Sequence, residues 1–175
     1  KAMFLNSECS TFPKINNPEL RIKTIDHLIT LPSWYFDQNK PLLKSIIKQV
    51  LLPLVNIGCS PRDQELAVIA LRNLAYTNLE NRTAIREAGG IVPLVRLLSS
   101  DLPITQENAV AALRNLAYTN LENRTAIQDA GGIVPLGRLL SSDSTDLQVY
   151  TYARFAFDVL DYNPENQTAI REEGE

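Results

Sequence analysis

The residues best suited to binding chemistry are an arginine and an asparagine that recur 42 residues apart. Arg72 and Asn73 lie in the run Ala-Leu-Arg-Asn-Leu-Ala-Tyr-Thr-Asn, and Arg114 and Asn115 take the same places in a second copy of that run. A guanidinium group can hold a carboxylate through two parallel hydrogen bonds, and a side-chain amide can donate and accept at once. The two pairs therefore indicate noncovalent recognition, repeated in register.

The residue types needed for catalysis are largely missing. His27 is the single histidine, so no Ser-His-Asp, Cys-His or His-metal set can be assembled. Cys9 and Cys59 lack metal-ligand spacing, and Gly89-Gly90 is not followed by the Lys-Ser/Thr of a phosphate-binding loop. We therefore expect a protein that is not an enzyme and that needs no cofactor and no metal.

The Arg-Asn pairs belong to a long internal repeat. Residues 70–101 and 112–143 are identical except at three paired positions, which are Arg86/Gln128, Glu87/Asp129 and Val95/Gly137. A diverged third copy covers 163–174, offset by 43 residues from 120–131. A period in the forties predicts a solenoid in which each repeat packs on its neighbours. Such near-identity indicates a recent duplication or a consensus-built array, and the glycine at position 137 favours duplication because it weakens a helix.

Within one repeat the pattern predicts three helices. The first spans 79–88 and is closed by Gly89-Gly90, which allow a left-handed turn. The second spans 91–98, with Pro93 in its first turn, and the third runs to about Tyr118 after a cap at Thr105 or a neighbour. The counterpart of the third helix in the preceding repeat is 64–76, which follows Pro61. No stretch shows sustained two-residue alternation, so we expect an all-α fold.

The first sixty residues are less regular and are predicted to form a divergent helical N-terminal cap. Leu52-Pro53-Leu54-Val55 matches Val92-Pro93-Leu94-Val95, so Leu42 to Ile57 reads as the second helix of an earlier repeat. Before it we expect an amphipathic helix over 19–31, a linker or short helix over 33–40, and coil over 1–17. The whole chain is predicted to be one array, 1–175: a cap or partial repeat over 1–60, then units 61–101, 102–143 and 144–175, the last truncated.

Composition narrows the classes of partner. The net charge is −3, so no basic surface suggests nucleic acid, and no apolar run approaches the ~20 residues of a membrane span. The two cysteines are read as free thiols of a reduced, intracellular protein, cytoplasmic or nuclear. Asn-x-Thr motifs begin at Asn81, Asn123 and Asn166, but they recur because the repeat recurs, and we do not expect them to be glycosylated.

These motifs resemble the armadillo repeat, the type found in β-catenin, plakophilins and importin-α. The resemblance rests on Glu80-Asn81, Ala84-Ile85, residues 88–95, Leu97-Leu98 and residues 70–75, and it recurs 42 residues on. It covers about 52–174 and implies a right-handed α-solenoid of three-helix repeats. HEAT repeats usually have two helices and lack the Gly-Gly break, and tetratricopeptide and ankyrin repeats have shorter periods.

The resemblance implies that the third helices line a concave groove holding an extended peptide, with an asparagine of each repeat bonded to the peptide backbone. In the third copy that asparagine position is expected near Phe157 or Asp158. The residues predicted to line the groove are Glu65, Ile69, Arg72, Asn73 and Tyr76 in one repeat, Glu107, Ala111, Arg114, Asn115 and Tyr118 in the next, and Asp158 in the last. The alternatives are a helix-to-helix hydrogen bond for each asparagine, and a solvated position or a salt bridge to Glu65 or Glu107 for each arginine.

The first functional hypothesis is therefore an adaptor that binds an extended partner peptide, acidic or mixed in charge. A second is a structural or self-assembly module that stacks through the end faces of the array, where a truncated last repeat would leave an apolar edge. A third, a nuclear transport adaptor, is disfavoured. Importin-α-type repeats place a tryptophan four residues before the asparagine, and Ile69 and Ala111 stand there instead.

Overall fold

The computed structural model describes residues 23, 25, 27, 40–55, 60–141 and 147–161. The coil predicted over 1–17, most of the helix predicted over 19–31, the linker 33–39 and the third copy of the motif over 163–174 lie outside the described residues. The described residues form helices joined by short turns, with no strand among them, and none of these helices is long and apolar enough to cross a membrane.

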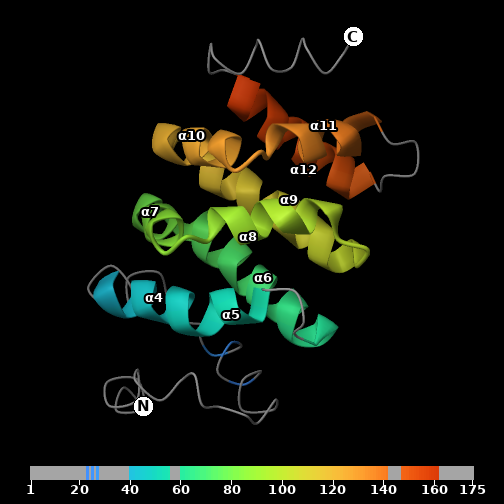
Figure 1. The fold of residues 1–175 in the computed structure, drawn as a ribbon. Helices are drawn as coiled ribbons and strands as arrows, with labels where there is room; N and C mark the ends of the chain where they lie inside the picture. The colour runs from blue at the N-terminus through green and yellow to red at the C-terminus, as the bar shows by residue number, and fades with distance from the viewer. Residues whose placement is uncertain are drawn as a thin grey trace.

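The helices stack in successive tiers (Figure 1). The tiers are the pairs α4–α5, α7–α8 and α10–α11, and α6, α9 and α12 pack alongside them. The bounds are α4 Lys40–Ile46, a π-helical turn Ile47–Leu51, α5 Leu52–Val55, α6 Pro61–Thr77, α7 Leu79–Glu87, α8 Ile91–Arg96, a 3-10 turn Leu97–Ser99, α9 Pro103–Ala117, α10 Leu121–Asp129, α11 Ile133–Ser141 and α12 Leu147–Asp161.

The third helices of successive repeats, α6, α9 and α12, make the most extensive contacts found among the described helices. Alanines allow this close approach because a methyl side chain adds little bulk between two helix axes. The buried alanines on these helices are Ala67, Ala70 and Ala75 on α6, Ala109, Ala111, Ala112 and Ala117 on α9, and Ala153 and Ala156 on α12. The exposed faces of α6, α9 and α12 are thereby held side by side.

The paired glycines end the first helix of each repeat as predicted. Gly89 and Gly131 adopt φ of +86° and +76°, a backbone region that side chains disfavour. Gly90 and Gly132 are needed for space, because a Cβ at either would lie 2.7 Å from the Cγ2 of an isoleucine on the preceding helix. The two positions of each pair therefore need glycine for different reasons.

Two predicted helix boundaries are corrected. Thr105 does not cap the third helix. It is buried inside α9, which begins at Pro103 after Leu102 with no side-chain cap. Proline favours this start because its fixed φ suits the first helical position. The second helix stops being α-helical at Arg96 and continues as a 3-10 turn, whereas its copy α11 stays α-helical to Ser141.

The segment predicted as one second helix over 42–57 is different in form. Residues 40–55 are helical throughout, with a π-helical turn before Pro53. Proline inside a helix removes a hydrogen bond and crowds the carbonyl four residues back, and a π turn accommodates the resulting change in pairing. In the later repeats the matching proline follows a Gly-Gly break and sits in the first turn, so α8 and α11 need no such irregularity.

Candidate functional site

The residues predicted to bind a ligand lie on α6, α9 and α12 or directly after α9. We refer to the set Glu65, Ile69, Arg72, Asn73, Tyr76, Glu107, Ala111, Arg114, Asn115, Tyr118 and Asp158 as the third-helix face. Asn73 and Asn115 are both partly buried. The Nδ2 of Asn115 donates to the backbone carbonyl of Arg72 at 3.2 Å, whereas the Asn73 amide has no partner among the described residues. The alternative of a helix-to-helix hydrogen bond thus holds for the Nδ2 of Asn115. The Oδ1 of Asn115 and the whole side-chain amide of Asn73 remain available to a ligand.

Arg72 is linked to the next third helix. Its Nη1 donates to Oδ1 of Asn108 at 2.7 Å, and Asn108 in turn donates from Nδ2 to the Ile104 carbonyl at 2.7 Å. The expected alternative, an ion pair with Glu65, is wrong, since Glu65 pairs with Arg62 at 3.4 Å. Arg72 is therefore oriented by a neutral partner and has no carboxylate partner among the described residues.

Arg114 has a different environment although its local sequence is the same. Its guanidinium carbon lies 4.6 Å from the ring centre of Phe155 and 5.3 Å from that of Tyr152, both on α12. Within the described part of the chain it makes no ion pair, and Glu107, the other expected partner, makes none either. Arg114 is thus held by stacking on aromatic rings, which leaves its N–H groups free of described partners.

The remaining residues of the face differ in their access to solvent. Tyr76 is 74% exposed and Tyr118 51% exposed, so both rings are open to a ligand. Ile69 is partly buried. Ala111 is only 3% exposed, so it is a core residue and not one that a ligand could contact. The structure thus brings the polar and aromatic members of the face to the surface but not Ala111.

The last repeat is shifted relative to the sequence-based alignment. Buried positions on α12 repeat those on α9 at an offset of 44, as the sets Thr105, Ala109, Ala112, Leu116 and Val149, Ala153, Ala156, Leu160 show. Val159 therefore stands where Asn115 stands, not Phe157 or Asp158 as expected. Asp158 matches Arg114, is exposed, and pairs with Arg154 at 3.0 Å. The same offset puts Phe155 at the position of Ala111.

Arg82 is a residue that the sequence reasoning missed. Its Nε donates to the Ala75 carbonyl at 2.8 Å, and its Nη1 donates to the Tyr118 carbonyl at 2.9 Å and to Oγ1 of Thr119 at 3.2 Å. The guanidinium also lies over the Tyr118 ring, 5.5 Å from its centre. One side chain thereby joins the C-terminal ends of α6 and α9 and fixes one end of the third-helix face. The sequence signal for this role was that the same arginine recurs as Arg124 in the second Asn-Arg-Thr motif.

The asparagines of the same motifs are structural. Asn81 is 1% exposed and Asn123 is fully buried, and the backbone N–H of each donates to the capping asparagine three residues earlier. The Nδ2 of Asn123 also donates to the Leu116 carbonyl at 3.0 Å and to the Arg82 carbonyl at 3.3 Å, which ties neighbouring repeats together. The Asn-x-Thr pattern here therefore serves the repeat interface.

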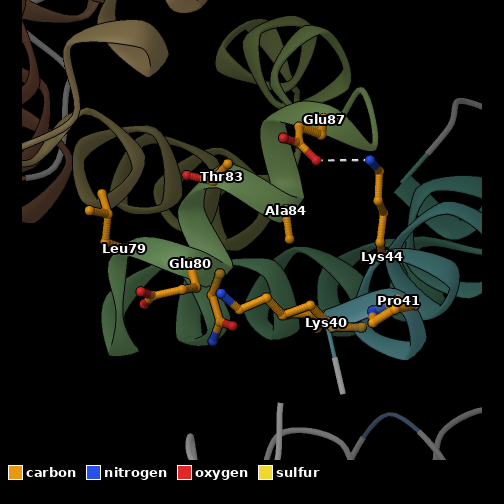
Figure 2. Close-up of a pocket in the computed structure, with 10 residues that line it drawn as sticks. Lys40, Pro41, Lys44, Leu79, Glu80, Thr83, Ala84 and Glu87 are labelled. Carbon is orange, nitrogen blue, oxygen red and sulfur yellow. Dashed lines mark hydrogen bonds and ion pairs between the residues drawn. The ribbon is translucent and has the colours of Figure 1, made fainter. Parts of the chain in front are cut away.

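A pocket of about 540 Å³ lies elsewhere, between α4 and α7 (Figure 2). Lys40 and Lys44 face Glu80 and Glu87 across it, and Lys44 pairs with Glu87 at 2.8 Å. The hydrogen bond from Lys44, followed by its positive charge, lowers the pKa of Glu87. Both partners are half exposed, so the pair is a surface salt bridge between tiers rather than a catalytic arrangement.

Tiers of helices joined by repeated side-chain contacts define a helical-repeat protein of the solenoid class. The family model for the armadillo/beta-catenin-like repeat matches residues 78–118, which contain α7, α8 and α9. Residues 78–118 thus form an armadillo repeat, as the sequence motifs predicted, and the fold is an armadillo-like solenoid. A search of curated proteins found no match.

Solved structures of designed armadillo repeat proteins are similar to this chain. One, in complex with a (KR)4 peptide, has a TM-score of 0.78 and 25% identity over 95% of this chain and 69% of its own. Another, computationally designed for modular peptide recognition, has a TM-score of 0.73 and 25% identity over 86% of this chain and 62% of its own. A third designed protein has a TM-score of 0.74 and 26% identity, and this chain covers 63% of its length. The chain thus spans less than two thirds of several relatives that it matches.

Proposed function

We propose that this protein is an intracellular scaffold that holds an extended segment of a partner protein along the third-helix face. The observation that carries the proposal is the equivalent placement of Asn73 and Asn115 on adjacent helices, with hydrogen-bonding capacity left over on both. An extended peptide presents backbone N–H and C=O groups at regular intervals. A side-chain amide matches both kinds of group, so such a row would tolerate many ligand sequences.

The related structures support this use of the face by analogy. One of them is in complex with a (KR)4 peptide, and another was computationally designed for modular peptide recognition. We propose the same mode for this chain as a single array, with 1–60 as a cap and 61–101, 102–143 and 144–175 as its units. Its role would be binding rather than catalysis, without a cofactor, in the cytoplasm or the nucleus.

The preferred ligand is acidic or mixed in charge. Arg72 and Arg114 recur in register, and neither has a carboxylate partner among the described residues. A basic nuclear-localisation peptide is disfavoured, because no tryptophan stands four residues before either asparagine and Arg114 already covers the Phe155 ring. Like charges on ligand and face would also repel.

The test is a titration of extended acidic, neutral and basic peptides against the wild-type protein and the Asn73→Ala/Asn115→Ala double variant. A matched control is Thr83→Ala/Thr125→Ala, which alters one polar side chain on the first helix of each repeat, away from the third-helix face. We expect binding to be lost in the asparagine variant and kept in the control, with circular dichroism unchanged in both. Binding that survives the asparagine changes would refute the proposal.

The self-assembly hypothesis gives a different pattern in the same samples. It predicts no peptide binding by either protein and a concentration-dependent mass by light scattering. That mass would be insensitive to the asparagine changes and sensitive to substitutions near Ala169 and Ile170. Such a result would move the function to the end faces of the array.

A further inference from the structure

The two copies of the Ala-Leu-Arg-Asn-Leu-Ala run present unequal arginines. Arg72 donates to Asn108 on the next third helix. At the offset of 44 residues that relates α9 to α12, the counterpart of Asn108 is Tyr152, and Arg114 stacks on that ring instead. The guanidinium carbon of Arg114 lies over the two rings, and no described hydrogen bond uses its N–H groups, so they remain open to a ligand.

Around Arg114 the side chains form a continuous series of cations and rings. Arg82 lies 5.5 Å from the centre of the Tyr118 ring, and the Tyr118 and Phe155 ring centres are 6.4 Å apart. Phe155 lies 4.6 Å from the Arg114 guanidinium, which also contacts Tyr152 at 5.3 Å. The series spans α7, α9 and α12, so it is assembled only when neighbouring repeats stack.

The charges near this series leave one cation without a described anionic partner. Asp158, the acid of α12 at the position equivalent to Arg114, pairs with Arg154. Glu107 lies seven residues before Arg114, roughly 10 Å along the helix axis, which is too far for an ordinary ion pair. The Nε and Nη1 of Arg82 donate to carbonyl and hydroxyl oxygens, whereas no hydrogen bond of the Arg114 guanidinium is found within the described residues. Arg114 is therefore the group in this series that is open to a carboxylate.

We infer that the surface where α9 meets α12 is a specificity subsite of the third-helix face. It takes an acidic residue of the peptide followed by a large apolar residue. In this subsite, Arg114 holds the Asp or Glu carboxylate of the peptide, and the exposed ring of Tyr118 and the half-buried ring of Phe155 pack against the apolar side chain. The equivalent surface between α6 and α9 lacks both the open arginine and the aromatic ring, because Arg72 is bonded to Asn108 and Ala111 stands where Phe155 stands on α12. The inference rests on the proposed function and adds a sequence preference to it.

The test uses blocked decapeptides of alternating Ser and Ala that carry one central pair, either Glu-Phe, Gln-Phe, Lys-Phe, Glu-Ala or none. Each peptide is titrated against the wild type, Arg114→Gln, Arg72→Gln and Arg138→Gln. Arg138 is exposed on α11, so its variant has the same loss of charge away from the third-helix face. For the wild type we expect Glu-Phe to bind roughly fivefold to tenfold more tightly than Gln-Phe, the range for a partly exposed charge-assisted contact.

The expected outcome is that Arg114→Gln removes the preference for Glu over Gln, that Arg72→Gln reduces it much less, and that Arg138→Gln keeps it. Phe155→Leu serves as a second variant and should reduce the preference for Phe over Ala next to the glutamate without changing the preference for Glu over Gln. Equal losses in Arg114→Gln and Arg72→Gln would overturn the subsite. Binding of all five peptides with equal affinity would overturn it while leaving the proposed function intact. No binding of any peptide would overturn both.

Discussion

Replacing Arg82 by glutamine tests whether one side chain sets the spacing of the third helices. Arg82 makes two short hydrogen bonds to the carbonyls of Ala75 and Tyr118, a longer one to Thr119, and a cation–π contact with Tyr118. Because Arg82 is partly exposed, each carbonyl bond is taken at about 1 kcal/mol and the cation–π contact at about 0.5 kcal/mol. Arg82→Gln should therefore lower the free energy of unfolding by about 2–3 kcal/mol.

The matched variant is Arg124→Gln in the next repeat. Arg124 makes a single described hydrogen bond, from Nε to the Ala117 carbonyl at 3.0 Å, so its replacement should cost only about 1 kcal/mol. Both variants are compared by urea unfolding monitored by circular dichroism at one protein concentration. Equal destabilisation by the two changes would refute the reasoning, because it would mean that the contacts of Arg82 across the repeat interface contribute nothing.

Four further substitutions test the packing of α11, the hydrogen bond of Asn115 and the Lys44–Glu87 salt bridge. Gly137→Ala should stabilise the protein by about 1 kcal/mol in urea unfolding, since the helix gains propensity and the nearest atom to the new Cβ is 3.9 Å away; destabilisation would contradict the packing of α11 on α12. Asn115→Ala should cost about 1 kcal/mol in the same assay and Asn73→Ala close to nothing, because only Asn115 bonds to the neighbouring repeat. Lys44→Met should raise the pKa of Glu87 toward its ordinary value in an NMR titration, since the Lys44 hydrogen bond lowers it. The contribution of this pair to stability is present above the unfolded-state pKa and is lost as the pH falls through the folded-state pKa; an unchanged Glu87 pKa in the variant would contradict the salt bridge.

The repeat period, the helices and the family were predictable because each depends on local pattern. The Gly-Gly turn and the apolar spacing are patterns within one unit, and the near-identity of two copies gives the period directly. Accordingly, α7 follows its predicted bounds to within a residue. The start of α9 at Pro103 was missed because a threonine nearby looked like a better cap. Proline at the first helical position decided the boundary instead.

The roles of the two arginines were not predictable from their own repeats. Arg72 and Arg114 have identical flanking sequence, and their difference comes from the following helix, which carries Asn108 in one case and Tyr152 in the other. The ion pair considered for Arg72 failed because Glu65 lies seven residues away on the same helix. Contacts between repeats, not within them, decide which groups of the face stay open.

The alignment of the last repeat with the preceding one was also not predictable from sequence comparison. The motif over 163–174 is offset by 43 residues, and applying that offset to α12 would align Asp158 with Asn115. The buried positions of α12 require 44, so Val159 takes that place and the row of asparagines ends at α9. The buried face of α12 therefore defines the alignment of the last repeat with α9, because too few identical residues remain there to define it from sequence.

The measurement that tests the central claim most directly is NMR mapping of side-chain amide groups during titration with an extended peptide such as the Glu-Phe decapeptide. If the third-helix face binds the backbone of the peptide, the Nδ2 resonances of Asn73 and Asn115 should shift with the same dissociation constant. The buried Nδ2 of Asn123, already bonded to backbone carbonyls, should stay unchanged as an internal reference. Saturable shifts confined to α7, α8, α10 and α11, with Asn73 and Asn115 unmoved, would contradict the account.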